Sequence, residues 1–85
     1  MNTAFLLMAQ HEKAFIPAEE VVQCYFSHLT LPKFLRKVSE GQIKLPLITT
    51  EDSQKSVKGV YVHDMAAYLD ERRDSAQRDF DRLHC

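Results

Sequence analysis

Glycine is scarce in this sequence, which holds two glycines, three prolines and no tryptophan among 85 residues. The chain therefore lacks a glycine-rich loop of the kind that cradles nucleotide phosphates. Two cysteines are too few for a disulfide framework, and we interpret Cys24 as a buried small hydrophobe and Cys85 as a terminal thiol. No apolar run approaches the roughly 20 residues of a membrane span. The apolar run from Ala4 to Ala9 is short and has no basic residue before it, so we expect a cytoplasmic protein without a signal peptide.

Spacings typical of catalytic or metal sites are also missing from the sequence. None of the four histidines forms a pair at zinc-ligand spacing with another histidine or a cysteine. The carboxylate pairs Asp70–Glu71 and Asp79–Asp81 lie in an arginine-rich segment, where a solvated helix face is the simpler interpretation. We therefore expect no enzyme, no metal and no cofactor.

Positive charge is concentrated in one part of this nearly neutral chain, whose formal net charge is −1. Six of the eleven basic residues lie between Thr30 and Val62, where only three acidic residues oppose them. A local excess of cations on one helix and one loop indicates a surface that reads DNA.

The first half of the chain predicts two helices joined by a short link. Residues 2–10 are apolar enough for either a buried strand or a helix, and their Ala, Leu and Met content favours the helix. A short strand could follow at residues 14–16. Pro17 and the two glutamates after it then begin a helix over about residues 18–26. Ser27 to Leu29 link this helix to a second one over about residues 30–40, which Thr30 caps and Gly41 ends.

The second half predicts a wing and a long final helix. The wing covers about residues 43–62, with Pro46 marking its first strand as an edge strand or a bulge. The last helix covers about residues 64–83. The sequence therefore predicts one domain over residues 1–85, of the α+β class and mainly α. Its expected architecture is a winged helix-turn-helix with a two-stranded wing and a long C-terminal helix.

The predicted DNA-reading residues belong to the second helix of the pair and to the wing. Lys33 and Arg36 are three residues apart and Lys33 and Lys37 four apart, so these side chains project from one side of a helix. Arginine pairs with guanine in the major groove, whereas lysines contact phosphates. The full predicted set is Thr30, Lys33, Arg36, Lys37, Lys44, Ser53, Gln54, Lys55 and Lys58. An ordinary solvated helix face is the simplest alternative for the helix cations.

The end of the last helix predicts an interface with other protein molecules. Few large apolar residues follow Arg73, and Phe80 is isolated among polar neighbours. Such a residue is a candidate anchor for a partner. Ala76, Phe80 and Leu83 therefore form the predicted homo-oligomerisation surface.

Several segments resemble one known family. NTAFLLMAQ, IPAEEV, YFSHL, KVSEGQIKLP, SQKSVKGVYVHD and AAYLDERR are similar to segments of the pyocin activator proteins, over roughly Met1 to Arg73. This resemblance implies a small bacterial, prophage-related transcription activator that binds repeated promoter elements in double-stranded DNA. RNA polymerase is a further candidate partner of such an activator. The chain also resembles the winged-helix excisionases and related phage regulators, which bend DNA.

Three hypotheses about function follow. The first is a sequence-specific activator that acts as a homo-oligomer on bacteriocin or prophage promoters. The second is an architectural, DNA-bending protein of the excisionase type, which would use the same fold. The third is a protein-interaction module with no nucleic-acid role, working through the final helix.

Overall fold

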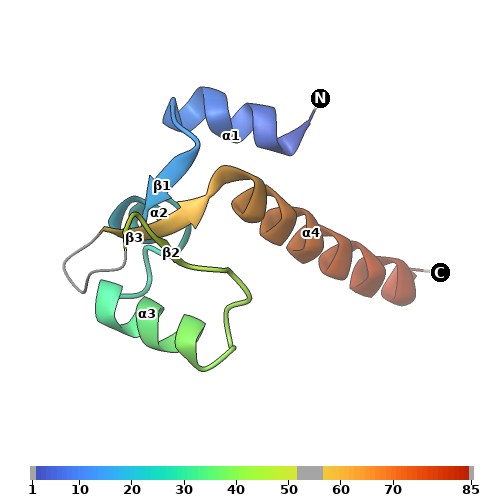
Figure 1. The fold of residues 1–85 in the computed structure, drawn as a ribbon. Coiled ribbons are helices and arrows are strands. Elements are labelled where there is room, and N and C mark those ends of the chain that lie inside the picture. The colour runs from blue at the N-terminus through green and yellow to red at the C-terminus, as the bar shows by residue number, and fades with distance from the viewer. Residues whose placement is uncertain (1, 52–56, 85) are drawn as a thin grey trace.

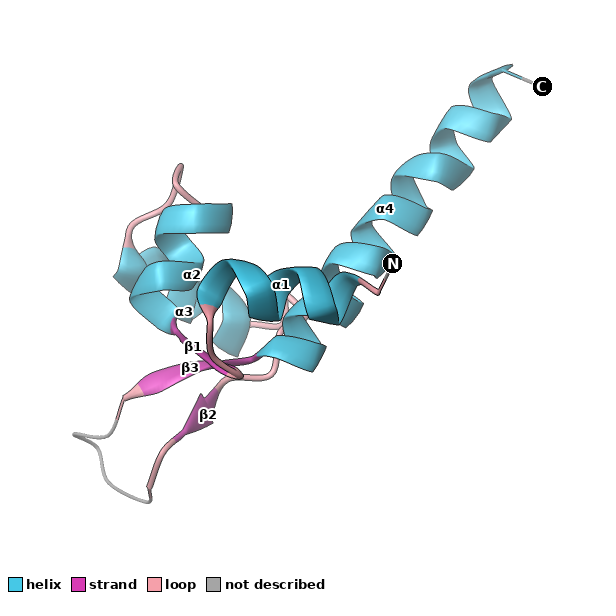
Figure 2. Cartoon of the chain, turned by 90° about the horizontal axis from the view of Figure 1, so that it is seen from above, coloured by secondary structure: helices cyan, strands magenta, loops and turns pink. Residues whose placement is uncertain are grey.

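The chain folds into four helices and a small sheet, as seen in a computed structural model that describes residues 2–51 and 57–84 (Figures 1 and 2). The fold is α+β and mainly helical, with a long C-terminal helix. Along the chain the elements are α1 (Thr3–His11), β1 (Phe15–Pro17), α2 (Ala18–Tyr25), α3 (Leu31–Ser39), β2 (Ile48–Thr49), β3 (Lys58–Tyr61) and α4 (Val62–His84).

The sheet has three antiparallel strands in the order β1-β3-β2. β2 and β3 lie in the segment predicted to form a two-stranded wing, and β1 adds a third strand on the other side of β3. β1 adds to β3 with Ile16 opposite Val60 and Pro17 opposite Gly59. Ile16 and Val60 are both completely buried. The third strand forms because pairing across β1 and β3 brings these two side chains into the core on one face of the sheet.

The first strand of the wing is much shorter than the sequence indicates. Only Ile48 and Thr49 pair with β3, opposite Gly59 and Lys58. Pro46 has no N–H to donate to a ladder, which disfavours a longer strand here. Ile43 and Leu45 are buried in the core instead. The connection between α3 and β2 is therefore an extended segment held by its side chains.

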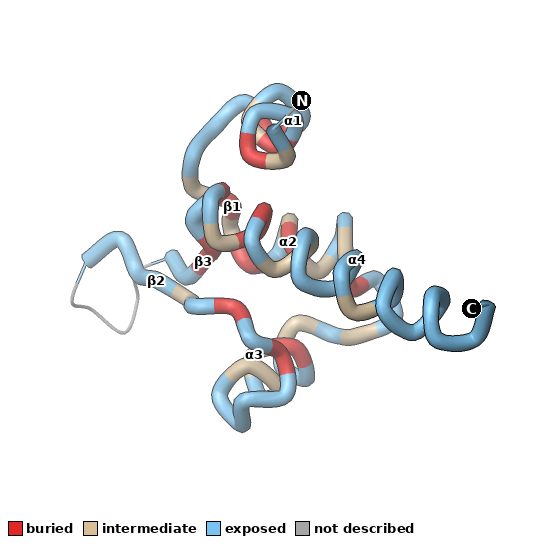
Figure 3. Tube along the Cα trace, turned by 90° about the vertical axis from the view of Figure 1, so that its right-hand side faces the viewer, coloured by how far each residue is buried: buried red, intermediate tan, exposed pale blue. Residues whose placement is uncertain are grey.

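The core lies where α1, α2, α3, the sheet and the start of α4 meet (Figure 3). Phe34 of α3 is fully buried, and its ring centroid lies 5.0 Å from that of Phe26. The ring centroid of Phe26 in turn lies 6.0 Å from the ring centroid of Tyr68 of α4. These aromatic contacts fix α3 against both α2 and α4, and so determine which face of α3 meets solvent.

The N-terminal segment is a helix, which is the alternative that its composition favours. The Asn2 side chain accepts a hydrogen bond from the Ala4 N–H at 2.7 Å and begins α1. His11 ends α1 as a buried side chain whose Nδ1 contacts the Glu20 carboxylate and whose Nε2 lies 2.9 Å from the Tyr25 hydroxyl. These contacts join α1 to α2.

Glu20 is also held by Lys13, whose Nζ lies 2.9 Å from the carboxylate. The hydrogen bonds from Lys13 and then His11 lower the pKa of Glu20. Burial raises the pKa of the neighbouring Tyr25 hydroxyl. These side chains form a polar cluster between α1 and α2, and its charged member Glu20 is partly exposed.

Cys24 corrects another expectation, because its side chain is exposed rather than buried. Val21, one turn earlier on α2, is fully buried in the core, whereas the core does not extend over Cys24. Cys85 lies outside the described residues.

Candidate nucleic-acid interface

α3 begins and ends where its sequence indicates. The Thr30 hydroxyl accepts a hydrogen bond from the Lys33 N–H at 3.4 Å, and Pro32 occupies the first turn. Gly41 follows the helix with φ +78°, a conformation that side chains rarely adopt. The Thr30 hydroxyl is therefore already used as a helix cap, although the residue is exposed.

The outer face of α3 carries the two cations with the most open surroundings. Lys33 and Arg36 are exposed, whereas Phe34 and Val38 face the core. Lys33 and Arg36 lie three residues apart, so they project from neighbouring positions one turn apart. The helix thus presents a guanidinium and an ammonium group to solvent along one ridge.

Lys58, at the start of β3, lies across a hollow from α3. Leu31 and Leu35 of α3 line one side of this hollow of about 450 Å³, and Val57 and Lys58 line the other. The hollow also contains Glu19 from the first turn of α2. Lys58 is therefore next to α3, and one carboxylate weakens the positive charge of this region.

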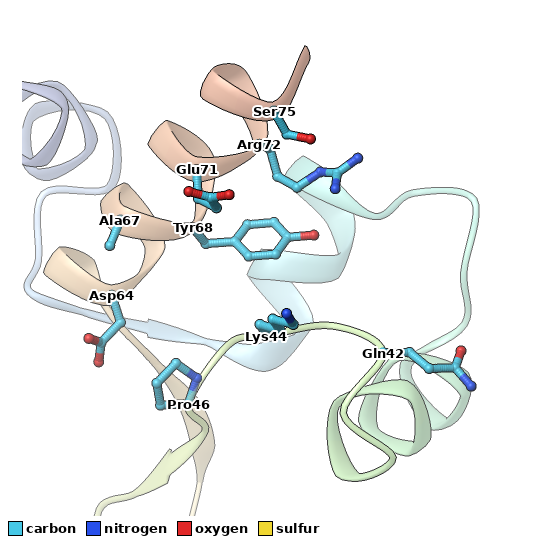
Figure 4. A pocket seen from close by; sticks show the side chains of 9 residues that line it. All are labelled: Gln42, Lys44, Pro46, Asp64, Ala67, Tyr68, Glu71, Arg72 and Ser75. Atoms are coloured by element: carbon cyan, nitrogen blue, oxygen red, sulfur yellow. The ribbon is translucent and has the colours of Figure 1, made fainter. Parts of the chain in front are cut away.

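Lys37 and Lys44 lie on the opposite side of α3 from Lys58, toward α4. Lys37 Nζ donates to the Gln42 side-chain oxygen at 3.3 Å, and Lys37 lines a hollow with Tyr68 and Arg72. Lys44 lines a second hollow of about 520 Å³ with the same tyrosine and arginine (Figure 4). The predicted cations are thus divided between two sides of α3.

Arg72 also lies at this surface, although no sequence pattern indicated it. In Figure 4 the Tyr68 side chain lies between those of Lys44 and Arg72. Asp64 and Glu71 line the same hollow, so this side is mixed in charge. No local spacing could have revealed Arg72, because only the packing of α4 brings it near Lys37 and Lys44.

Three predicted residues of the wing, Ser53, Gln54 and Lys55, lie outside the described residues. Within residues 2–51 and 57–84 no group of three or more His, Cys, Asp or Glu side chains is arranged to hold a metal ion. In the same part of the chain, no helix is long and apolar enough to cross a bilayer.

The predicted oligomerisation residues Ala76, Phe80 and Leu83 are all exposed on α4. Phe80 keeps 57% and Leu83 79% of its surface in contact with solvent. This half of α4 projects from the body of the molecule (Figure 1).

The fold and surface describe a small, mainly helical α+β protein with an exposed basic helix. The family model for pyocin activator protein PrtN matches residues 3–76, and the chain belongs to that family, as its sequence motifs predicted. No curated protein and no solved structure matches. Membership indicates a role as a transcription activator of pyocin genes, in a family of regulators rather than of known enzymes.

Proposed function

We propose that this protein activates bacteriocin or prophage genes by binding specific promoter DNA as a winged helix-turn-helix. In this proposal α2 and α3 form the helix-turn-helix and β2 and β3 form the wing. The protein acts in the bacterial cytoplasm as a homo-oligomer and contacts RNA polymerase. The observation that carries the proposal is the exposed pair Lys33 and Arg36 on α3, with Lys58 across the adjoining hollow.

The geometry of α3 suits insertion into the major groove. A groove about 12 Å wide admits one α-helix. Phe34 anchors the inner face of α3 in the core, so the opposite face is free to approach base edges. Arg36 is long enough and rigid enough in its donor geometry to pair with the O6 and N7 atoms of guanine. Arg36 is therefore assigned to base recognition.

Lys58 and Lys33 are assigned to the phosphates on either side of the groove. A lysine is a flexible point charge and reads no base pattern by itself. Lys58 lies at the base of the wing, next to the N-terminal half of α3. A duplex strand that follows this hollow would meet Lys58 on one side and the N-terminal half of α3 on the other. Because the total charge is only −1, affinity must come from such local contacts and from several subunits acting together.

The division of labour is tested with two alanine variants and one control. Binding is measured by fluorescence anisotropy on matched and scrambled promoter duplexes at several salt concentrations. Arg36→Ala should lose matched binding by about 1–3 kcal/mol while scrambled binding changes little. Lys58→Ala should weaken both duplexes equally and reduce the salt slope by about one. The control is Arg78→Ala, which removes an exposed cation from α4.

Each result can contradict the proposal. Equal binding of wild-type protein to matched and scrambled duplexes would remove sequence specificity. If Arg36→Ala and Lys58→Ala lose affinity in the same pattern, the assignment of bases to one and phosphates to the other is wrong. If Arg78→Ala is as damaging as either, the binding surface is not the face formed by α3 and the wing.

A further inference from the structure

α1 has an apolar surface where a solvent-facing helix is normally charged. Its sequence TAFLLMAQH contains no Lys, Arg, Asp or Glu. Ala4, Leu7 and His11 face inward and are buried, yet Phe5 keeps 63% and Leu6 51% of its surface exposed. A helix that is apolar all round is usually covered on all sides. We call Phe5, Leu6 and the exposed Ala9 the α1 ridge.

α4 has an apolar stripe that continues beyond the body of the protein. Val62, Met65 and Leu69 follow one another at helical spacing and face the core. The same spacing continues seven residues later through Ala76, Phe80 and Leu83, which are exposed. We call these three residues the α4 tail stripe. The α4 tail stripe lies on the same side of α4 that α1 and the core cover nearer to the sheet.

α1 covers only the first part of α4. The Thr3 hydroxyl donates to the Asp70 carboxylate at 2.8 Å, and the Val62 N–H donates to the Ala14 carbonyl at 2.7 Å. The two helices therefore run in opposite directions, and α1 begins beside Asp70. Beyond that level α4 continues alone (Figure 1).

We propose that a second copy of this chain covers both surfaces, with the α4 tail stripe of each copy seated on the α1 ridge of the other. In a dimer with two-fold symmetry, the two α4 helices would run in opposite directions, and both contacts would form at once. Such an interface is closed, because each surface meets its complement and neither remains free. The inference rests on the homo-oligomer of the proposed function and names the two surfaces that pair, and it does not depend on DNA binding.

Charge favours this occupant over a strongly charged partner. The α1 ridge presents no charge to the α4 tail stripe. On the tail, Arg78 lies 3.4 Å from Glu71, and Arg82 lies 2.7 Å from Asp79. Basic and acidic side chains thus neutralise one another within one helix, and the two helices can approach without a large net repulsion.

The area of these surfaces reaches the lower end of the range for specific protein–protein interfaces. Phe5, Leu6, Phe80 and Leu83 leave on the order of 400 Å² of apolar surface exposed in each chain. Their polar neighbours would bring the total for both partners to about the 1,200 Å² at which specific interfaces begin.

Variants of the full chain that introduce a charge on one of the two apolar surfaces test the pairing. Wild-type protein should sediment at twice the 9.9 kDa chain mass at micromolar concentration. Phe5→Lys and Phe80→Glu should each weaken the dimer at least tenfold, because each homodimer loses both contacts. An equimolar mixture of the two variants should recover the dimer, since one contact becomes Lys against Glu and the other is native. Arg78→Glu, on the far side of α4 from the stripe, is the control and should remain dimeric.

Both substituted residues are exposed within one chain, so far-ultraviolet circular dichroism should show unchanged helix content for each variant. A monomeric wild type would overturn the proposal. A dimer that survives Phe5→Lys but not Phe80→Glu would show that the tails pair with each other. A mass that grows steadily with concentration would show an open chain of copies instead of a closed pair, and would also overturn it.

Discussion

Gly59 is the position in the wing where adding one methyl group should destabilise the fold most. It lies in β3 opposite Pro17 and Ile48, in the middle of the sheet. A Cβ built on Gly59 would collide with the Ile16 carbonyl oxygen and lie 2.5 Å from Cζ of Phe15. Ordinary contacts of a Cβ begin at 3.4 Å, so the neighbouring backbone would have to move by about 1 Å.

The loss of stability in Gly59→Ala depends on which neighbouring atoms have to move. The Phe15 ring can rotate away, but the Ile16 oxygen belongs to β1, whose movement would disturb the pairing of Ile16 with Val60. Overpacking of this kind costs about 1–3 kcal/mol, and loss of the ladder places Gly59→Ala at the upper end. For a domain of this size the melting temperature should fall by roughly 4–8 °C for each kcal/mol.

Urea denaturation followed by circular dichroism measures the effect. Gly41→Ala is the comparison: space around Gly41 is open, but its φ of +78° is strained for alanine, so about 1 kcal/mol is expected. Gly59→Ala combined with Phe15→Ala should recover only part of the loss, because the carbonyl contact remains. A Gly59→Ala protein within 0.5 kcal/mol of wild type would refute the close approach of β1 and β3.

Three other predictions concern charge and packing. Glu19→Gln should strengthen binding to matched and scrambled duplexes alike by a few fold, because it removes a carboxylate from the hollow beside Lys58; unchanged anisotropy titrations would place the DNA elsewhere. Glu20→Gln should lower the melting temperature at pH 7 and flatten its decline in acid. The lowered pKa of Glu20 adds stability above its ordinary value of 4.5, and that stability is lost as the pH falls through the folded value; parallel melting curves of the two proteins from pH 3 to 7 would contradict this. Phe34→Ala should cost about 3–5 kcal/mol in urea denaturation because the ring is fully buried; a loss under 1 kcal/mol would mean that α3 is not anchored by this ring.

The helices could be predicted from local sequence because their causes are local. Thr30 caps α3 and Gly41 follows its end, as their side chains and backbone preferences require. α2 begins directly after Pro17. The apolar spacing of α4 holds from Val62 onward, one or two residues before the expected start.

The sheet and the distribution of cations could not be predicted in the same way. A short strand was expected at residues 14–16, but its pairing partner was not, because Ile16 pairs with Val60, forty-four residues later, and no local pattern encodes that pairing. Lys37 and Lys44 turn toward Arg72 because Phe26 and Tyr68 hold α3 against α4. Helical spacing alone placed Lys33 and Lys37 together, but tertiary packing separates their surroundings. The single-domain organisation and the DNA-binding residues stay predictions.

Amide NMR of the labelled chain during titration with a promoter duplex tests the proposed interface most directly. If α3 and the wing contact DNA, the largest shifts will fall on Lys33 to Lys37 and on Lys58 to Val60. The amides of Ala76 to Leu83 should change little at low ratios of DNA to protein. Shifts concentrated around Lys44 and Arg72, or along the end of α4, would contradict recognition of DNA through α3.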